Sequence, residues 1–165
     1  MTLTGSQHLR YARHVVLPEI GEEGQRKLLA SKVLVVGAGA LGSPAALYLA
    51  AAGVGKIGIM DGDRVDISNL QRQILHTTNS VGSLKTESAQ ERIGAIDPDI
   101  HVEPFPFRLT DGNAPGILSR YDFVIDATDN FSSKFLIARA CHMAGKACSH
   151  AGIRNFHGQA MTVMP

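Results

Sequence analysis

The sequence has few cysteines, almost no excess charge and no long apolar run. Cys141 and Cys148 are its two cysteines. They are too few for a disulfide framework and lie too far apart for a zinc-binding pair, so we expect both to be buried core side chains. The formal net charge of +1 over 165 residues gives no reason to expect a nucleic-acid partner. The longest apolar stretch, 45–54, is far short of the roughly 20 residues that a membrane span needs.

The composition that remains is that of an ordinary folded protein, with 44% hydrophobic and 19% charged residues. A chain of 165 residues fits one domain that buries roughly two-thirds of its unfolded surface. We therefore expect residues 1–165 to form a single domain, in which residues 1–30 are an N-terminal helical segment. Residues 1–9 lack a basic region followed by an apolar stretch, so we expect a cytoplasmic location.

Short apolar segments alternate with helical patterns along the chain. Strands are predicted at 32–36, 56–60, 100–105, 123–125, 147–149 and 159–164, and helices at 43–52, 81–96 and 132–144. The run 32–36 has no polar interruption, as expected for a strand buried on both faces of a parallel sheet. Pro104 should push its strand toward an edge. The alternation predicts an α/β fold with a doubly wound, mostly parallel, Rossmann-like sheet and helices on both faces.

A glycine-rich turn, Gly37-x-Gly39-Ala40-x-Gly42, follows the first of these strands. Such a turn lets the backbone approach a phosphate group closely and aims the first N–H groups of a helix at the anion. Asp61 comes about 19 residues later, near the spacing at which an acid binds a ribose hydroxyl. These features predict a binding site for an adenine nucleotide, and NAD is the commonest occupant of such sites. An NAD(P)-dependent oxidoreductase is therefore one alternative.

Further charged and polar residues are expected at the same edge of the sheet. They are Asp63, Asn69, Arg72, Lys85 and the acids at 126–129. This set suits a triphosphate with a bound metal, because arginine and lysine offset charge on a leaving pyrophosphate and a carboxylate holds Mg²⁺. A dehydrogenase would instead need an acid or base near a hydride path and a separate substrate domain, and neither is visible in the sequence.

Six segments of the chain, taken in order, resemble one known family. They are residues 10–13, 37–42, 61–63, 68–73, Lys85 and 126–130. The family comprises the adenylyltransferases, of the ThiF, MoeB and HesA type, that activate ubiquitin-like sulfur carriers in thiamine and molybdopterin biosynthesis. Ubiquitin-activating enzymes are distant relatives. The string Ser-Asn-Leu-Gln-Arg-Gln at 68–73 is the most specific part of the resemblance.

The resemblance implies that ATP activates the C-terminal glycine carboxylate of a carrier ending in Gly-Gly. The product would be an acyl-adenylate, with release of pyrophosphate. On the matching positions, Asp61 would hold the ribose and Lys85 would stabilise the developing charge. Arg13 matches an arginine that the family inserts into the neighbouring subunit's site, which implies a homodimer. The remaining matches are Asn69 and Arg72 at the phosphates, Asp63 and Asn130 in the nucleotide site, and Asp129 on Mg²⁺.

The sequence departs from the family pattern in three places. Ala40 stands where a further glycine is common, and His14 where glutamine is usual. Relatives also continue into a crossover segment and two Cys-x-x-Cys pairs that bind structural zinc, and residues 1–165 contain neither. We therefore expect a truncated chain or a short relative with no zinc ligands, and a non-catalytic nucleotide-binding half is a further alternative.

Overall fold

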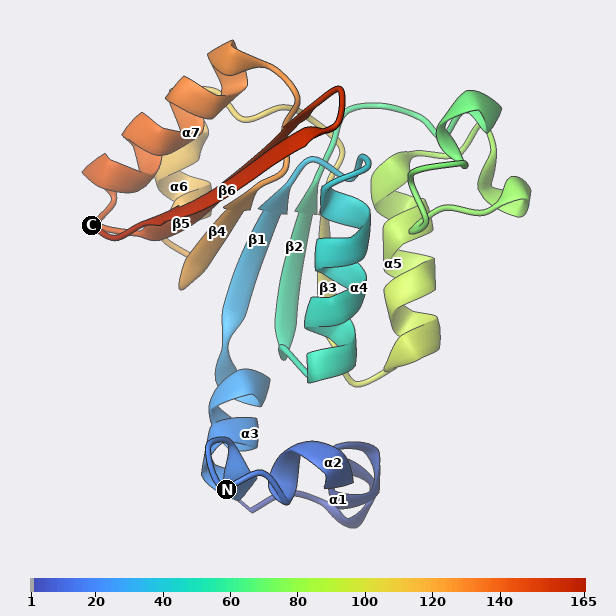
Figure 1. The fold of residues 1–165 in the computed structure, drawn as a ribbon, viewed down its shortest axis with the longest axis vertical. Coiled ribbons are helices and arrows are strands. Elements are labelled where there is room, and N and C mark those ends of the chain that lie inside the picture. The colour runs from blue at the N-terminus through green and yellow to red at the C-terminus, as the bar shows by residue number, and fades with distance from the viewer. Residues whose placement is uncertain (1) are drawn as a thin grey trace.

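A six-stranded sheet forms the centre of the computed structural model, which describes residues 2–165 (Figure 1). The strand order is β3-β2-β1-β4-β5-β6, and only the last pair, β5 with β6, is antiparallel. The strands are β1 (Lys32–Val36), β2 (Lys56–Met60), β3 (His101–Phe105), β4 (Phe123–Asp126), β5 (Ala147–Arg154) and β6 (His157–Val163). The predicted doubly wound, mostly parallel sheet is confirmed.

Helices cover both faces of the sheet (Figure 1). Helices α4 and α5 lie on one face, α6 and α7 on the other, and α1 to α3 lie beyond the amino ends of the strands. The helices are α1 (Gly5–Arg10), α2 (Ala12–Val15), α3 (Gly21–Ala30), α4 (Gly42–Ala52), α5 (Lys85–Ile96), α6 (Ala114–Leu118) and α7 (Phe131–Met143), with 3-10 turns η1 (Ile67–Asn69) and η2 (Thr78–Ser80). Among residues 2–165, none of the helices combines the length and apolarity needed to cross a bilayer.

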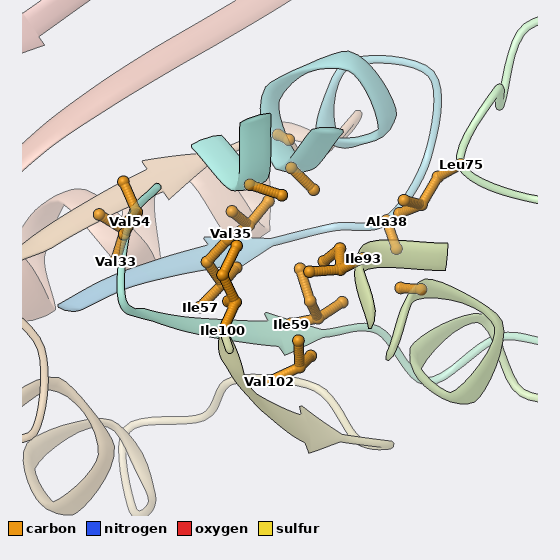
Figure 2. Close-up of a cluster of buried hydrophobic side chains, with 14 residues drawn as sticks. Val33, Val35, Ala38, Val54, Ile57, Ile59, Leu75, Ile93, Ile100 and Val102 are labelled. Carbon is orange, nitrogen blue, oxygen red and sulfur yellow. The ribbon is translucent and has the colours of Figure 1, made fainter. Parts of the chain in front are cut away.

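The burial of β1 on both faces of the sheet explains why its sequence is apolar without interruption. Val33 and Val35 point into the cluster beneath α4 and α5 (Figure 2), and Leu34 and Val36 point into the cluster beneath α6 and α7. Successive side chains of a strand face opposite sides of the sheet, so both faces must be apolar here. Burial of each such side chain stabilises the fold by about 1.5–3 kcal/mol.

Three local predictions can be compared directly with the structure. The strand with Pro104, β3, is at the edge of the sheet, as predicted. Cys141 and Cys148 are buried in the cluster beneath α7, also as predicted. The helix predicted at 81–96 is wrong at its start, since α5 begins at Lys85. Gly82 has a left-handed φ of +89° and Leu84 is extended, so this stretch cannot be helical.

The N-terminal segment is helical, but Tyr11 interrupts it between α1 and α2. The Tyr11 hydroxyl donates a hydrogen bond to Asp97, which follows α5. The buried Gln25 donates to the carbonyl of Ala52 at 3.0 Å and contacts His14 Nδ1 at 2.8 Å. These contacts attach the segment to the amino-end side of the sheet, away from the glycine turn.

Candidate active site

An open cleft of about 1190 Å³ lies at the carboxyl ends of the central strands. Parallel sheets of this kind bind ligands at that edge, because the loops after neighbouring strands meet there. Nine of the residues predicted for the site line this cleft. They are Gly37, Gly39, Ala40, Asp61, Asp63, Arg72, Lys85, Asp129 and Asn130. Residues from five separate stretches of the chain are thus brought to one surface.

Three predicted residues lie elsewhere. Gly42 is buried behind the turn, where a Cβ atom would come within 1.8 Å of the Gly37 carbonyl oxygen. Asn69 is at the end of η1, and its Nδ2 donates to Ser68 Oγ at 3.4 Å. Arg13 is exposed on α2, and this helix lies beyond the amino ends of the strands, at the end of the sheet away from the cleft (Figure 1). Arg13 is therefore not part of this cleft within one chain.

In the glycine turn, Gly37 as well as Gly42 requires glycine, whereas Gly39 leaves space. Gly37 has φ +99°, and a Cβ there would lie 2.8 Å from the carbonyl oxygen of Ala127. A side chain at Gly37 would therefore be strained and would clash. A Cβ added at Gly39 would have Gln73 Nε2 as its nearest heavy atom, 3.8 Å away. Gly39 thus leaves free space on the cleft side of the turn, where a ligand can approach the backbone.

Asp61 and Lys85 form the floor of the cleft. Asp61 Oδ2 accepts a hydrogen bond from the Ala38 N–H, and Oδ1 accepts one from the Asp63 N–H, both at 2.8 Å. Lys85 is buried at the start of α5, with its Nζ 3.2 Å from Asp63 Oδ2 and 3.9 Å from Asp61 Oδ2. The two carboxylates hold the ammonium group in place beside the glycine turn. A bound phosphate would meet a positive charge whose position is already fixed.

Arg72 and Asp129 also line the cleft. Arg72 is exposed, and its Nη1 donates to the Ser68 carbonyl at 3.0 Å. Asp129 is also exposed, and its Oδ1 accepts from Asn130 Nδ2 at 3.4 Å. Asn130 caps α7 by accepting a hydrogen bond from the Ser133 N–H at 2.9 Å. The cleft therefore also faces the N-terminus of a helix, which favours anions.

Asp126, three residues before Asp129, has partners that sequence reasoning missed. It is fully buried. Its Oδ1 accepts from the Thr128 N–H and hydroxyl at 2.9 and 2.6 Å. Its Oδ2 is 3.3 Å from Lys134 Nζ and 2.7 Å from His150 Nδ1. Because Asp126 is saturated with such bonds, it shapes the loop rather than facing a ligand. No local pattern links positions 126, 134 and 150, so only the fold reveals this cluster.

Gln73 is a second residue whose place the sequence did not reveal, although it ends the specific string 68–73. It lines the cleft and is 5% exposed. Its side-chain Oε1 is buried without a hydrogen-bond partner among residues 2–165. A buried acceptor without a donor is costly, and a ligand that donates a hydrogen bond would offset that cost. Gln73 is thus a further candidate ligand-binding residue.

The acids of the cleft fit Mg²⁺ better than zinc. Mg²⁺ is commonly held by one or two carboxylates together with substrate phosphates and water. Asp129, exposed at the cleft, offers one such carboxylate. Structural zinc needs four protein ligands. Among residues 2–165 no three His, Cys, Asp or Glu side chains are close enough to hold a metal on their own.

A Rossmann-like sheet with this cleft defines a nucleotide-binding protein of the α/β class. The model of the ThiF family matches residues 11–165, and the chain belongs to that family. It is 44% identical over its full length to the SAMP-activating enzyme E1 of Haloferax volcanii. It is 48% identical over 150 residues, 91% of the chain, to the sulfur carrier protein adenylyltransferase of Thermus thermophilus. A third relative, a probable molybdopterin-synthase adenylyltransferase of Porphyra purpurea, is 47% identical over 98% of the chain.

Solved structures of similar fold are also found. The E. coli tRNA N6-threonylcarbamoyladenosine dehydratase TcdA in complex with ATP matches 90% of the chain with a TM-score of 0.83 and 30% identity. That match covers 60% of the TcdA chain. The chain likewise spans part of its sequence relatives: 61% of the Haloferax enzyme, 55% of the Thermus enzyme and 42% of the Porphyra enzyme.

Proposed function

We propose that the chain is the adenylation domain of an enzyme that activates a ubiquitin-like sulfur-carrier protein. The carrier would be one that ends in Gly-Gly. The observation that carries this proposal is the meeting of the glycine turn, Lys85, Arg72 and Asp129 at one cleft. Dinucleotide oxidoreductases share the glycine turn, but they give no reason for a buried lysine and an arginine beside it. Relatives named as adenylyltransferases further support ATP as the nucleotide.

The proposed reaction is an attack of the carrier's terminal carboxylate oxygen on the α-phosphorus of ATP. A bond forms between these two atoms, and the bond from the α-phosphorus to the bridging oxygen of the β-phosphate breaks. The products are a carrier acyl-adenylate and pyrophosphate. Negative charge moves onto the leaving pyrophosphate, so fixed cations beside it lower the barrier. Catalysis of this kind consists of positioning and electrostatic stabilisation.

The predicted site residues divide the work of this reaction. The backbone N–H of Gly39 would hold the phosphates, because the Gly37 N–H already donates to the Met60 carbonyl at 2.8 Å and Gly37 serves to shape the turn. Arg72 would contact the phosphates from the cleft lining, and Asn69 would contact them from the end of η1, beside the cleft. Lys85 would stabilise charge on the leaving group. Asp61 would accept from the ribose, although its oxygens already accept from two backbone N–H groups. A carboxylate can accept about four hydrogen bonds, so a ribose hydroxyl can join them.

Magnesium and a second subunit complete the proposal. Asp129 would hold Mg²⁺ together with the phosphates, and the ion would neutralise part of their charge when bound. Arg13 would enter the cleft of a partner copy, which makes a homodimer the proposed active form. Arg13 is exposed on α2, which lies at the end of its own sheet away from the cleft, and this supports an action in trans. Asp63 would keep Lys85 in place through their 3.2 Å ion pair.

The degree of sequence identity to named relatives supports a carrier protein, rather than another carboxylate, as the acyl substrate. The chain is 44–48% identical to the relatives named for sulfur carriers, for SAMP activation and for molybdopterin synthase. It is 30% identical to the tRNA-modifying dehydratase whose ATP complex shares its fold. ATP binding is compatible with both groups. The higher identity therefore supports a carrier protein as the acyl substrate.

Isotope exchange between pyrophosphate and ATP tests the proposal. Exchange requires that the adenylate forms and reverses, so it should depend on a carrier ending in Gly-Gly. A carrier lacking its last glycine is the matched control and should support no exchange. Exchange without any carrier, or ATP binding with no exchange at all, would contradict carrier adenylation. Tight binding of NADH with no binding of Mg-ATP would instead support the alternative function, an NAD(P)-dependent oxidoreductase.

A further inference from the structure

His76 lies buried between the glycine turn and helix α5. It is 5% exposed, with ring Nε2 2.9 Å from the Ala38 carbonyl oxygen and Nδ1 3.0 Å from Ser88 Oγ. A carbonyl oxygen can only accept, so the proton must be on Nε2. Nδ1 of the neutral ring then accepts from the Ser88 hydroxyl. Burial lowers the pKa of His76 below its ordinary value, in keeping with a neutral ring.

The contact with Ala38 fixes the part of the turn that faces the cleft. Ala38 is 1% exposed and lies with Leu75 at the same end of the apolar cluster (Figure 2). Its N–H is held by Asp61 and its carbonyl by His76, so the peptide groups on both sides of this residue are fixed. In a trans peptide the C=O and N–H point in opposite directions. The N–H of Gly39 therefore points away from His76, and Gly39 lines the cleft.

The contact with Ser88 ties the same ring to the helix that carries Lys85. Ser88 is 5% exposed and lies three residues after Lys85, one turn further along α5. The imidazole thus joins the phosphate-facing turn to the helix that presents the ammonium group. Asp61 forms a parallel link, since its Oδ2 accepts from Ala38 and lies 3.9 Å from Lys85 Nζ.

We propose that His76 is a positioning residue that sets the glycine turn and Lys85 in register for one triphosphate. Both ring nitrogens are engaged and the ring is nearly inaccessible, so the two contacts leave the imidazole little freedom to move. His76 acts through Ala38 and Ser88 and touches no substrate. Its consequence for catalysis rests on the proposed adenylation, whereas its consequence for ATP binding does not.

Two amide substitutions distinguish the contribution of the Nε2–H hydrogen-bond donor from that of the imidazole ring itself. The amide nitrogen of His76→Gln reaches about as far as Nε2, so it can still donate to the Ala38 carbonyl. The amide of His76→Asn reaches only as far as Nδ1. We expect His76→Asn to weaken Mg-ATP binding about tenfold in calorimetry, since it loses a buried hydrogen bond, and His76→Gln to stay within about threefold of wild type. His101→Asn, at an exposed residue of β3, is the matched control.

Nitrogen-15 NMR of the wild-type chain tests the inferred tautomer without any change in folding. One of the seven histidines, assigned to His76 by its loss in His76→Gln, should show the Nε2–H form at pH 7. Mg-ATP should shift the backbone amide of Gly39 and leave that tautomer unchanged. The Nδ1–H form, a charged ring at pH 7, or wild-type ATP affinity in a folded His76→Asn variant would each overturn the proposal.

Failure of this inference and failure of the proposed function give different results. If wild type binds Mg-ATP but supports no carrier-dependent exchange, carrier adenylation is wrong and the His76 measurements still stand. If exchange occurs but His76→Asn binds ATP like wild type, the function stands and the positioning role is wrong. Should His76→Asn fail to fold, the wild-type tautomer and the His76→Gln affinity decide the question.

Discussion

Replacement of Lys85 by methionine is the most direct test of the electrostatic argument. The Lys85 side chain is 7% exposed, and its ammonium lies between Asp63 and Asp61. Methionine keeps the length and apolar stem of the side chain, so the change removes mainly the charge. Loss of one preorganised group that stabilises transition-state charge typically slows a reaction about 10²–10³-fold, or roughly 2.7–4 kcal/mol. We expect a loss of that size in carrier-dependent adenylation at saturating ATP.

The fold should tolerate the same substitution. Asp61 keeps two backbone N–H donors, and the Asp63 side chain is 57% exposed and stays hydrated. Loss of the pair with the solvated Asp63 costs about 1 kcal/mol or less, and the longer 3.9 Å contact with Asp61 is the weaker of the two. Urea unfolding should therefore show a small change beside the large change in rate. The two measurements together separate a catalytic defect from a folding defect.

Lys27→Met is the matched control for this experiment. Lys27 makes an exposed ion pair with Glu23 on α3, far from the cleft, with 74% of its side chain accessible. The control should retain the wild-type rate. A Lys85→Met variant that is folded and adenylates the carrier at a near-normal rate would refute the assignment of transition-state stabilisation to this lysine.

Three further predictions follow from the site and its surroundings. Gly37→Ala should lower the midpoint of thermal unfolding, because Gly37 has a φ of +99° and an added Cβ would lie 2.8 Å from the Ala127 carbonyl oxygen. Gly39→Ala should keep the wild-type midpoint and weaken ATP binding. Equal midpoints for the two variants would contradict this prediction. Arg13→Ala mixed with Asp129→Ala should recover part of the exchange activity in mixed dimers, and no recovery would argue against action in trans. The pKa of His76 is lower in the folded chain than in the unfolded chain, so near neutral pH the unfolded chain binds more protons. The stability that the neutral His76 ring contributes is therefore complete above about pH 6.5, the ordinary pKa of histidine. It is lost as the pH falls through the lower pKa of His76 in the folded chain. Urea titrations from pH 8 to pH 5 should show this slope in wild type and a smaller slope in His76→Gln.

The sequence predicted the central strands well because their environment leaves little choice. Strands β1 and β2 begin and end where the apolar runs 32–36 and 56–60 do. A strand covered by helices on both faces must be apolar throughout, so its limits can be read from composition. Helix α5 shows the opposite case. Its apolar spacing continues upstream through Leu84, which belongs to an extended segment, so periodicity alone placed the helix start too early.

The cleft was predictable as a place, but not as a network of contacts. Residues that follow neighbouring parallel strands meet at one edge, so the topology alone brings Asp61 and Asp129 to the same cleft. The contacts of His76 with Ala38 and of His150 with Asp126 join residues that are far apart in the sequence. No periodicity or spacing encodes such pairs, because the first depends on how two loops pack and the second on the register of β4 against β5.

The acids at 126 and 129 show how the fold divides one motif into two tasks. Both follow the apolar run of β4, and both looked alike as members of an acidic pair. Asp126 ends the strand facing inward, where four donors saturate its oxygens. Those bonds hold Thr128 and the start of the loop, so Asp129 is carried outward to the cleft with a largely free carboxylate. The buried acid shapes the loop, and the exposed acid is thereby left available for the charge of a bound ligand.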